Sequence, residues 1–325
     1  MIAIYGASVT KQKEGYAKRL KKDLGEKVKI FAYGGMHLND AAICFVQDVT
    51  KYHPEYCFID WFSTGYTRTD NATIEYIDTL IYAFSEIGCK IIFLFLPRNN
   101  IEERKDYYTF CKAILNEREV HFIDINQELS PEDELTNILR DAVHTTYYGS
   151  NLYSEIIISK FDEIKSDLQI LQNISPTKYN NIKKLKVSRT FNNYILLRGN
   201  CEILGFYVTV GPHSGLVKIS DGKNISIINT WDRYCYYPRN HFVLPITLNG
   251  DLRFNVLNDA FDTIGYEGTY DFTNEKKKLI IHGIYFIGQR IKILNIDDSS
   301  SINHFLILWQ KLMSRLRQLK SKIQQ

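Results

Sequence analysis

Five short apolar runs alternate with amphipathic stretches from residue 1 to about residue 170, and this alternation constrains the fold more than any other feature of the chain. Short apolar runs rich in β-branched and aromatic residues are typical of buried strands. Strands that alternate with helices predict an α/β fold, in which right-handed crossovers build a parallel five-stranded sheet with helices on both faces. The predicted strands are Ile2–Tyr5, Val28–Tyr33, Cys57–Phe62, Lys90–Leu96 and Val120–Ile125.

The helical stretches between these strands end at glycine or just before proline, which are usual helix stops. Gly25 and Gly88 follow two of the stretches, and Pro54 follows a third. The predicted helices are Glu14–Leu24, Asn39–Tyr52, Ile74–Ile87 and Ile101–Glu117, then a short helix that opens at Ser130-Pro131 and a last one from about Thr146 to Leu168.

The pattern changes after residues 173–184, where Ser175-Pro176 and Asn180-Asn181 indicate a linker. Beyond it, short alternating strands are separated by turn signals, of which Asp221-Gly222 and Asn249-Gly250 are typical hairpin dipeptides. Strands at this spacing without intervening helices predict a β-sandwich. Its predicted strands are Ile195–Leu197, Gly205–Val210, Leu216–Ser220, Ile225–Ile228, His241–Ile246, Leu252–Val256, Lys278–Phe286 and Arg290–Leu294.

The end of the chain has a third character, because from Ile302 onward apolar side chains recur every three or four positions and the polar face is basic. A basic amphipathic helix can lie on an anionic membrane or pair with a partner helix, and it can equally pack on its own domain. The predicted organisation is an α/β domain over residues 1–172, a linker over 173–184, a β-sandwich over 185–298 and a C-terminal helix over 299–325.

Composition excludes several classes of protein. The net charge of +3 is too small to indicate a nucleic-acid partner. The sequence contains no run of 18 apolar residues that could span a bilayer, and we expect no signal peptide, because its basic segment, apolar segment and cleavage site are not visible. The six cysteines are dispersed without a Cys-x-x-Cys pair, which favours buried reduced thiols. We therefore expect a cytoplasmic protein, with peripheral contact at the inner face of the membrane if the C-terminal helix binds lipid.

A serine stands where the first strand ends, in Gly6-Ala7-Ser8. Glycine permits a sharp turn off the strand, so Ser8 is expected at the carboxyl edge of the sheet, where α/β proteins bind their ligands. A serine at such a position is either a nucleophile or simply a turn residue. This short motif does not decide between the two.

A second candidate cluster lies late in the α/β domain, where Asp141 and His144 are three residues apart in a loop before the last helix. At that spacing the carboxylate can reach one imidazole nitrogen and leave the other for a hydroxyl. The aspartate would fix the tautomer and stabilise the imidazolium, while the histidine takes a proton from serine. The alternative is a capping aspartate beside a surface histidine.

Taken together, these motifs resemble the SGNH (GDSL-like) hydrolase superfamily over about residues 1–170. Gly6-Ala7-Ser8 matches its first block, although Ala7 stands where aspartate is usual. Asp141-Ala142-Val143-His144 matches its last block, Asp-x-x-His. The order of secondary structure agrees with the flavodoxin-like sheet of that family. The resemblance implies a catalytic triad of Ser8, His144 and Asp141.

The resemblance also implies an oxyanion hole. Its second block, a glycine after strand 2, corresponds to Tyr33-Gly34-Gly35-Met36, and we favour the amide of Gly35 over that of Gly34. The third block, Gly-x-Asn-Asp, is altered: Thr64 stands where asparagine is expected, next to Ser63. The predicted hole therefore consists of the amides of Ser8 and Gly35 with Thr64 as the third donor.

The activity implied by the resemblance is hydrolysis of an acyl ester through an acyl-enzyme, with O-acetyl groups of a carbohydrate as the expected substrate. One alternative is a sugar O-acetyltransferase that uses the same triad and an acetyl donor such as acetyl-CoA; another is a non-catalytic glycan-binding or scaffold protein. Trp231 and Tyr234 are candidate sugar contacts in the β domain. No cofactor motif is present and no metal is expected, since His37, His53 and His121 lack ligand spacing.

Overall fold

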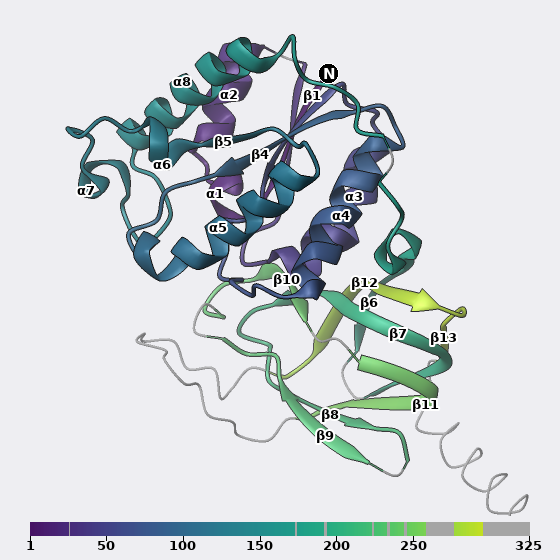
Figure 1. Ribbon diagram of the computed structural model, residues 1–325. Coiled ribbons are helices and arrows are strands. Elements are labelled where there is room, and N and C mark those ends of the chain that lie inside the picture. Colours follow the sequence, from purple (N-terminus) through teal and green to yellow (C-terminus); the bar gives the residue numbers. More distant parts are fainter. Residues whose placement is uncertain are drawn as a thin grey trace, which may run out of the picture. The chain divides into compact units, whose positions relative to one another are not determined.

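The computed structural model describes residues 1–25, 27–172, 174–191, 194–222, 224–232, 235–243, 246–257 and 276–294. The chain divides into two compact units, Met1–Lys183 and Lys184–Gln325 (Figure 1). The predicted C-terminal helix and Tyr234 lie outside the described residues.

The first unit contains the predicted parallel sheet. Its strand order is β2-β1-β3-β4-β5, and each neighbouring pair is parallel. This is the flavodoxin-like order. All five predicted strands are confirmed: β1, β3 and β4 are apolar runs that are almost wholly buried, whereas the edge strand β2 is partly exposed. Their bounds are β1 (Ile2–Gly6), β2 (Val28–Ala32), β3 (Tyr56–Asp60), β4 (Lys90–Phe95) and β5 (Phe122–Asp124).

Helices cover both faces of this sheet. Alternate residues of β4 point to opposite faces of the sheet. Ile92 and Leu94 belong to the core that the sheet forms with α2 and α8. Phe95 points to the other face, where its ring centroid lies 5.2 Å from that of Tyr108 in α5. On the second face α3 packs against α4. The helices are α1 (Ser8–Lys11), α2 (Tyr16–Leu24), the π-helical turn η1 (Leu38–Ala42), α3 (Ile43–Thr50), α4 (Asn71–Ser85), α5 (Ile101–Glu117), α6 (Ile125–Glu128), α7 (Leu135–Ile138) and α8 (Tyr147–Ile164) (Figure 1).

The helix predicted to open at Ser130 begins later. The Ser130 amide donates to Asp133 Oδ2 at 2.8 Å, so the acidic residue closes a turn, and α7 starts only at Leu135. The last helix begins where the sequence indicated. Its N-cap is Thr146, whose hydroxyl accepts the amide of Gly149 at 3.0 Å.

Most of the segment interpreted as a linker packs on the first unit. The 3₁₀-helix η2 (Lys178–Asn181) lies against α4, where the hydroxyls of Thr177 and Thr79 are 2.6 Å apart and Asn180 Nδ2 donates to the Thr79 carbonyl at 3.1 Å. The division between units falls directly after it, at Lys183.

The second unit is antiparallel β throughout its described part, as predicted. The 17-residue strand β7 joins its neighbours into one hydrogen-bonded sheet with the path β6-β12-β7-β11-β8-β9. Strands β10 and β13 also pair with β7. The strands are β6 (Lys183–Phe191), β7 (Tyr194–Val210), β8 (Leu216–Ser220), β9 (Ile225–Asn229), β10 (Arg239–Val243), β11 (Ile246–Val256), β12 (Leu279–Gly288) and β13 (Lys292–Leu294).

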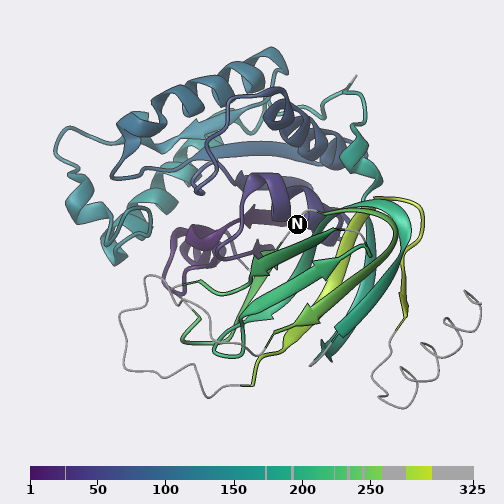
Figure 2. The same cartoon turned by 90° about the horizontal axis from the view of Figure 1, so that it is seen from below.

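One face of β7 is buried along its whole length, so the sheet curls around its own core (Figure 2). Its first half pairs with β11 and β13, and its second half pairs with β10 and β12. A close approach at Gly205 fixes the bend, because a Cβ built there would lie 2.0 Å from the Phe242 ring. The Asp221-Gly222 hairpin is confirmed between β8 and β9, but Asn249-Gly250 lies inside β11, paired with Asn200 and Gly199.

Candidate active site

Ser8 is the first residue of α1, immediately beyond β1. The turn requires glycine at position 6, since a Cβ built there would come within 2.2 Å of Thr10 Oγ1 and 2.6 Å of the Asp60 carbonyl oxygen. Ser8 is partly exposed, and its hydroxyl makes no hydrogen bond within the described residues. The serine is therefore accessible at the carboxyl edge of the sheet.

Asp141 and His144 form the predicted pair. His144 Nδ1 lies 3.0 Å from both carboxylate oxygens of Asp141. Asp141 Oδ1 also accepts the amides of Val143 at 3.0 Å and His144 at 2.8 Å. Burial alone would raise the pKa of Asp141, but these amide hydrogen bonds and the adjacent imidazole outweigh it, so the pKa is lowered. An ionised Asp141 holds the proton of His144 on Nδ1 and leaves Nε2 as an acceptor.

Gln12 ties the loop of His144 to the segment that carries Ser8. Its Nε2 donates to the Thr145 carbonyl at 2.7 Å, and its Oε1 accepts the Thr145 amide at 3.1 Å. Thr145 follows His144 directly, and Gln12 is the C-cap of the helix that begins with Ser8. No hydrogen bond joins Ser8 to His144, yet the clamp keeps both segments at one edge of the sheet.

A buried carboxylate lies beneath Ser8. Asp60, at the end of β3, accepts from Ser63 Oγ at 2.6 Å and from Thr10 Oγ1 at 2.9 Å, and the hydroxyls of Thr10 and Tyr16 are 2.8 Å apart. The Ala7 amide donates to the Asp60 carbonyl at 3.2 Å. Burial raises the pKa of Asp60 to about 6. Asp60 thus connects the helix that begins with Ser8 to the loop after β3.

Both glycines proposed for the oxyanion hole lie in the loop after β2. A Cβ built on Gly34 would be 4.0 Å from Ser8 Cβ, so this loop runs directly beside the candidate nucleophile. Gly35 has φ of +72°, a conformation that favours glycine. The amide of Gly35, the next along the chain after Gly34, remains the predicted donor.

The hydroxyl of Thr64 is already used. Thr64 Oγ1 donates to the Trp61 carbonyl at 3.0 Å, and Ser63 Oγ donates to Asp60. Because each hydroxyl carries one proton, neither offers an oxyanion donor in this conformation. Two arginines fasten the same loop: Arg98 Nη1 donates to the Ser63 carbonyl at 2.5 Å, and Arg104 donates to the carbonyls of Phe62 and Thr64.

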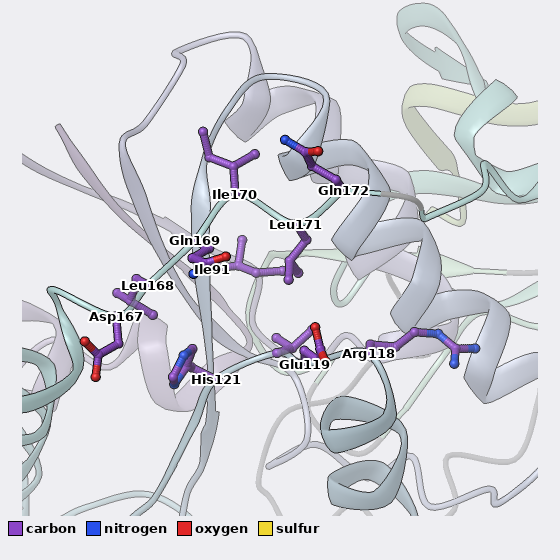
Figure 3. Close-up of a pocket in the computed structure, with 11 residues that line it drawn as sticks. Ile91, Arg118, Glu119, His121, Asp167, Leu168, Gln169, Ile170, Leu171 and Gln172 are labelled. Atoms are coloured by element: carbon purple, nitrogen blue, oxygen red, sulfur yellow. The ribbon is translucent and has the colours of Figure 1, made fainter.

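A cavity of about 500 Å³ lies at the opposite edge of the sheet (Figure 3). It is lined by Ile91 near the start of β4, by Val120 and His121 just before β5, and by residues 167–172. The strands are parallel, so the amino ends of β4 and β5 lie opposite the edge that carries Ser8. This cavity contains none of the predicted site residues.

In the second unit, the candidate sugar contact Trp231 is a core residue. It is 7% exposed and packs among the apolar side chains of the curled sheet, so it does not present a free ring face to a sugar. The sequence could not reveal this, since sandwich cores and sugar sites both use tryptophan. Tyr236 and Tyr237 from the same stretch are exposed, at 51% and 45%.

All six cysteines are buried and unpaired. In the part of the chain that the structure describes, no cluster of three or more histidine, cysteine, aspartate or glutamate side chains could hold a metal ion. Within the same residues, none of the helices combines the length and apolar character needed to cross a membrane.

Neither a protein-family model nor a curated protein matches the sequence. Solved structures do match. A two-domain esterase active on acetylated mannans, co-crystallised with mannopentaose, has a TM-score of 0.64 at 12% identity over 89% of this chain and 91% of that chain. Another structure of a two-domain esterase active on acetylated mannans has a TM-score of 0.62 at 11% identity over 90% and 92%.

The chain therefore has the fold of these two-domain esterases. An acetyl xylan esterase also matches, with a TM-score of 0.42 at 15% identity, over 49% of this chain and 98% of its own. The match to the two-domain esterases extends over both units, so the likeness includes the antiparallel β unit as well as the parallel sheet.

Proposed function

We propose that this protein is a serine esterase that removes O-acetyl groups from a carbohydrate. The observation that carries the proposal is the Asp141–His144 pair, which Gln12 ties to the segment that begins with Ser8, whose hydroxyl makes no hydrogen bond within the described residues. An ionised aspartate on Nδ1 leaves Nε2 of the imidazole ready to accept the serine proton.

In the proposed reaction, Ser8 Oγ attacks the acetyl carbonyl carbon while His144 Nε2 takes its proton. The tetrahedral intermediate collapses when His144 returns this proton to the departing sugar oxygen, which leaves an acetyl-serine. Water then attacks, again deprotonated by His144, and acetate leaves as Ser8 recovers its proton. The amides of Ser8 and Gly35 are the proposed donors to the oxyanion.

The likeness to two-domain esterases active on acetylated mannans supports a carbohydrate as the alcohol part of the ester. Transfer of the acetyl group to a sugar hydroxyl would use the same acyl-enzyme. The two reactions differ only in which nucleophile the site admits.

The test is active-site labelling together with acetate release. A fluorophosphonate probe loses fluoride when a serine oxygen attacks its phosphorus, so it should label the wild-type protein and the Ser166→Ala control but not Ser8→Ala. Ser166 is an exposed serine just beyond α8. Acetate release from acetylated mannan should follow the same order.

Folded wild-type protein that neither reacts with the probe nor releases acetate would refute the esterase proposal and favour a binding role. If acetate release falls when an unacetylated oligosaccharide is added, and acetylated acceptor accumulates, the protein is a transferase.

A further inference from the structure

The loop after β3 lacks the donor that the oxyanion hole would need from it. The hydroxyls of Thr64, which stands where asparagine is expected, and of its neighbour Ser63 both donate to acceptors within their own loop or strand. A well-placed third donor in acyl-transfer sites contributes about 10²–10³-fold to kcat. A donor from another segment must therefore reach the same place.

His37 lies against this loop. A Cβ built on Gly65, the residue after Thr64, would be 3.1 Å from His37 Cε1. His37 also belongs to the loop of Gly34, which runs beside Ser8. The imidazole is thus held between the two loops that flank the candidate nucleophile.

The local backbone fixes the position of this imidazole. The His37 amide donates to Asp40 Oδ1 at 2.7 Å, and burial raises the pKa of that carboxyl to about 6. The residues that follow, Leu38–Ala42, form the π-helical turn η1. Single π-helical turns are costly and occur frequently at functional sites.

The two ring nitrogens of His37 have different surroundings. Nδ1 is buried and has no hydrogen-bond partner, whereas Nε2 is not buried and makes no hydrogen bond within the described residues. A proton on Nδ1 would leave a buried donor unsatisfied, so we assign the proton to Nε2. Burial and the charge of Arg104 lower the pKa of His37, which keeps the ring neutral near pH 7.

We propose that His37 is a catalytic residue whose Nε2–H donates to the ester carbonyl oxygen as it becomes the oxyanion, in the place where Thr64 has no proton to offer. This inference rests on the proposed esterase function. No proton is transferred in this step. The hydrogen bond strengthens as negative charge develops on the oxygen and weakens when the carbonyl forms again.

The experiment compares His37→Leu, His37→Gln and the control His121→Gln on p-nitrophenyl acetate and on its thionoester. His121 lines the cavity at the other edge of the sheet. His37→Leu should lower kcat about 10²-fold with little change in KM. His37→Gln should recover part of this loss, because its amide keeps a donor, and His121→Gln should match the wild type.

The thionoester separates an oxyanion donor from a structural residue. Sulfur accepts hydrogen bonds more weakly than oxygen, so a donor to this atom favours the oxygen ester. The oxygen-to-sulfur ratio of kcat/KM should therefore fall in His37→Leu. A structural role would slow both substrates equally, and thermal melting of each variant reports any loss of folding.

An unchanged oxygen-to-sulfur ratio or a wild-type kcat in folded His37→Leu would overturn the inference while leaving the esterase proposal intact. Wild-type protein that hydrolyses neither ester while Ser8 remains unlabelled would overturn both.

Discussion

Replacing Asp60 by asparagine should change how stability depends on pH. Asp60 is fully buried, and its carboxylate accepts hydrogen bonds from the hydroxyls of Ser63, Thr10 and Tyr16 and from the Ser63 backbone. Burial raises its pKa from 3.8 to about 6, against the opposing effect of those hydrogen bonds. The folded state therefore holds the proton of Asp60 at pH values where the unfolded chain has lost it.

The sign and size of the effect follow from this difference. Well below pH 4 the carboxyl is protonated in both states, and its burial costs no stability. As the pH rises from about 4 to about 6, the unfolded chain loses the proton that the folded state still holds, so stability falls, and above pH 6 the loss is complete. A shift of roughly two pKa units corresponds to about 3 kcal/mol of unfolding free energy, lost between pH 4 and pH 7.

The assay is urea unfolding of the full chain between pH 4 and pH 7.5. Asp60→Asn has no ionisable group at this site, so its unfolding free energy minus that of the wild type should rise by about 3 kcal/mol over this range. Asp162→Asn, on the exposed side of α8, is the matched control and should follow the wild type. If the unfolding free energies of Asp60→Asn and the wild type change with pH in parallel, the pKa of Asp60 is not raised in the folded state.

Substitutions at two further positions test the Asp141–His144 pair and the hydrogen bonds between Gln12 and Thr145. Asp141→Asn should lower kcat on p-nitrophenyl acetate by at least about 10²-fold, because an amide no longer holds the His144 proton on Nδ1; steady-state kinetics equal to the wild type would contradict this. Gln12→Ala should lower the unfolding free energy by about 1–3 kcal/mol, since Thr145 is buried and its amide and carbonyl lose their partner, and kcat should fall with it. Gln12→Glu, which keeps the acceptor but not the donor, should lie between the two in urea unfolding.

The parallel sheet could be predicted from the sequence because each of its strands is marked by its own residues. A strand buried on both faces is a continuous apolar run, as in Lys90–Phe95, and no distant partner is needed to recognise it. Strand β6 was not predicted, because Lys183–Phe191 is mostly exposed and rich in lysine, and its place in the sheet depends on pairing with β12.

Two similar dipeptides in the second unit have different outcomes, because strand pairing as well as local sequence decides whether the chain turns. Asp221-Gly222 forms the predicted hairpin, and Gly222 has φ of +90°. Asn249-Gly250 carries the same signal, and Gly250 has φ of +95°, yet it continues β11 because Asn200 Oδ1 accepts the Gly250 amide from the neighbouring strand. A turn dipeptide fixes local backbone conformation, and only tertiary pairing decides whether the chain reverses there.

In the site, what could be predicted is what lies close together in the sequence. Asp141 and His144 are three residues apart, and their contact follows from that spacing. Gln12 and Thr145 are 133 positions apart, and only the folded sheet brings them together. The sequence has no signal for this clamp, since glutamine at a helix end is ordinary.

The role proposed for His37 could not be predicted from the sequence. Because His37 lacks the spacing of a metal ligand, the sequence gives no reason to single it out. An oxyanion donor needs no sequence motif, because a single N–H or O–H group next to the reacting carbonyl oxygen is sufficient. Whether His37 or Thr64 supplies this group depends on which of the two side chains already donates to another acceptor. The Thr64 hydroxyl donates its hydrogen bond to the Trp61 carbonyl, whereas Nε2 of His37 makes no hydrogen bond within the described residues. Where a catalytic motif has lost its usual donor residue, the hydrogen bonds made by the neighbouring loops therefore identify the donor better than the residue that occupies the same position in the sequence.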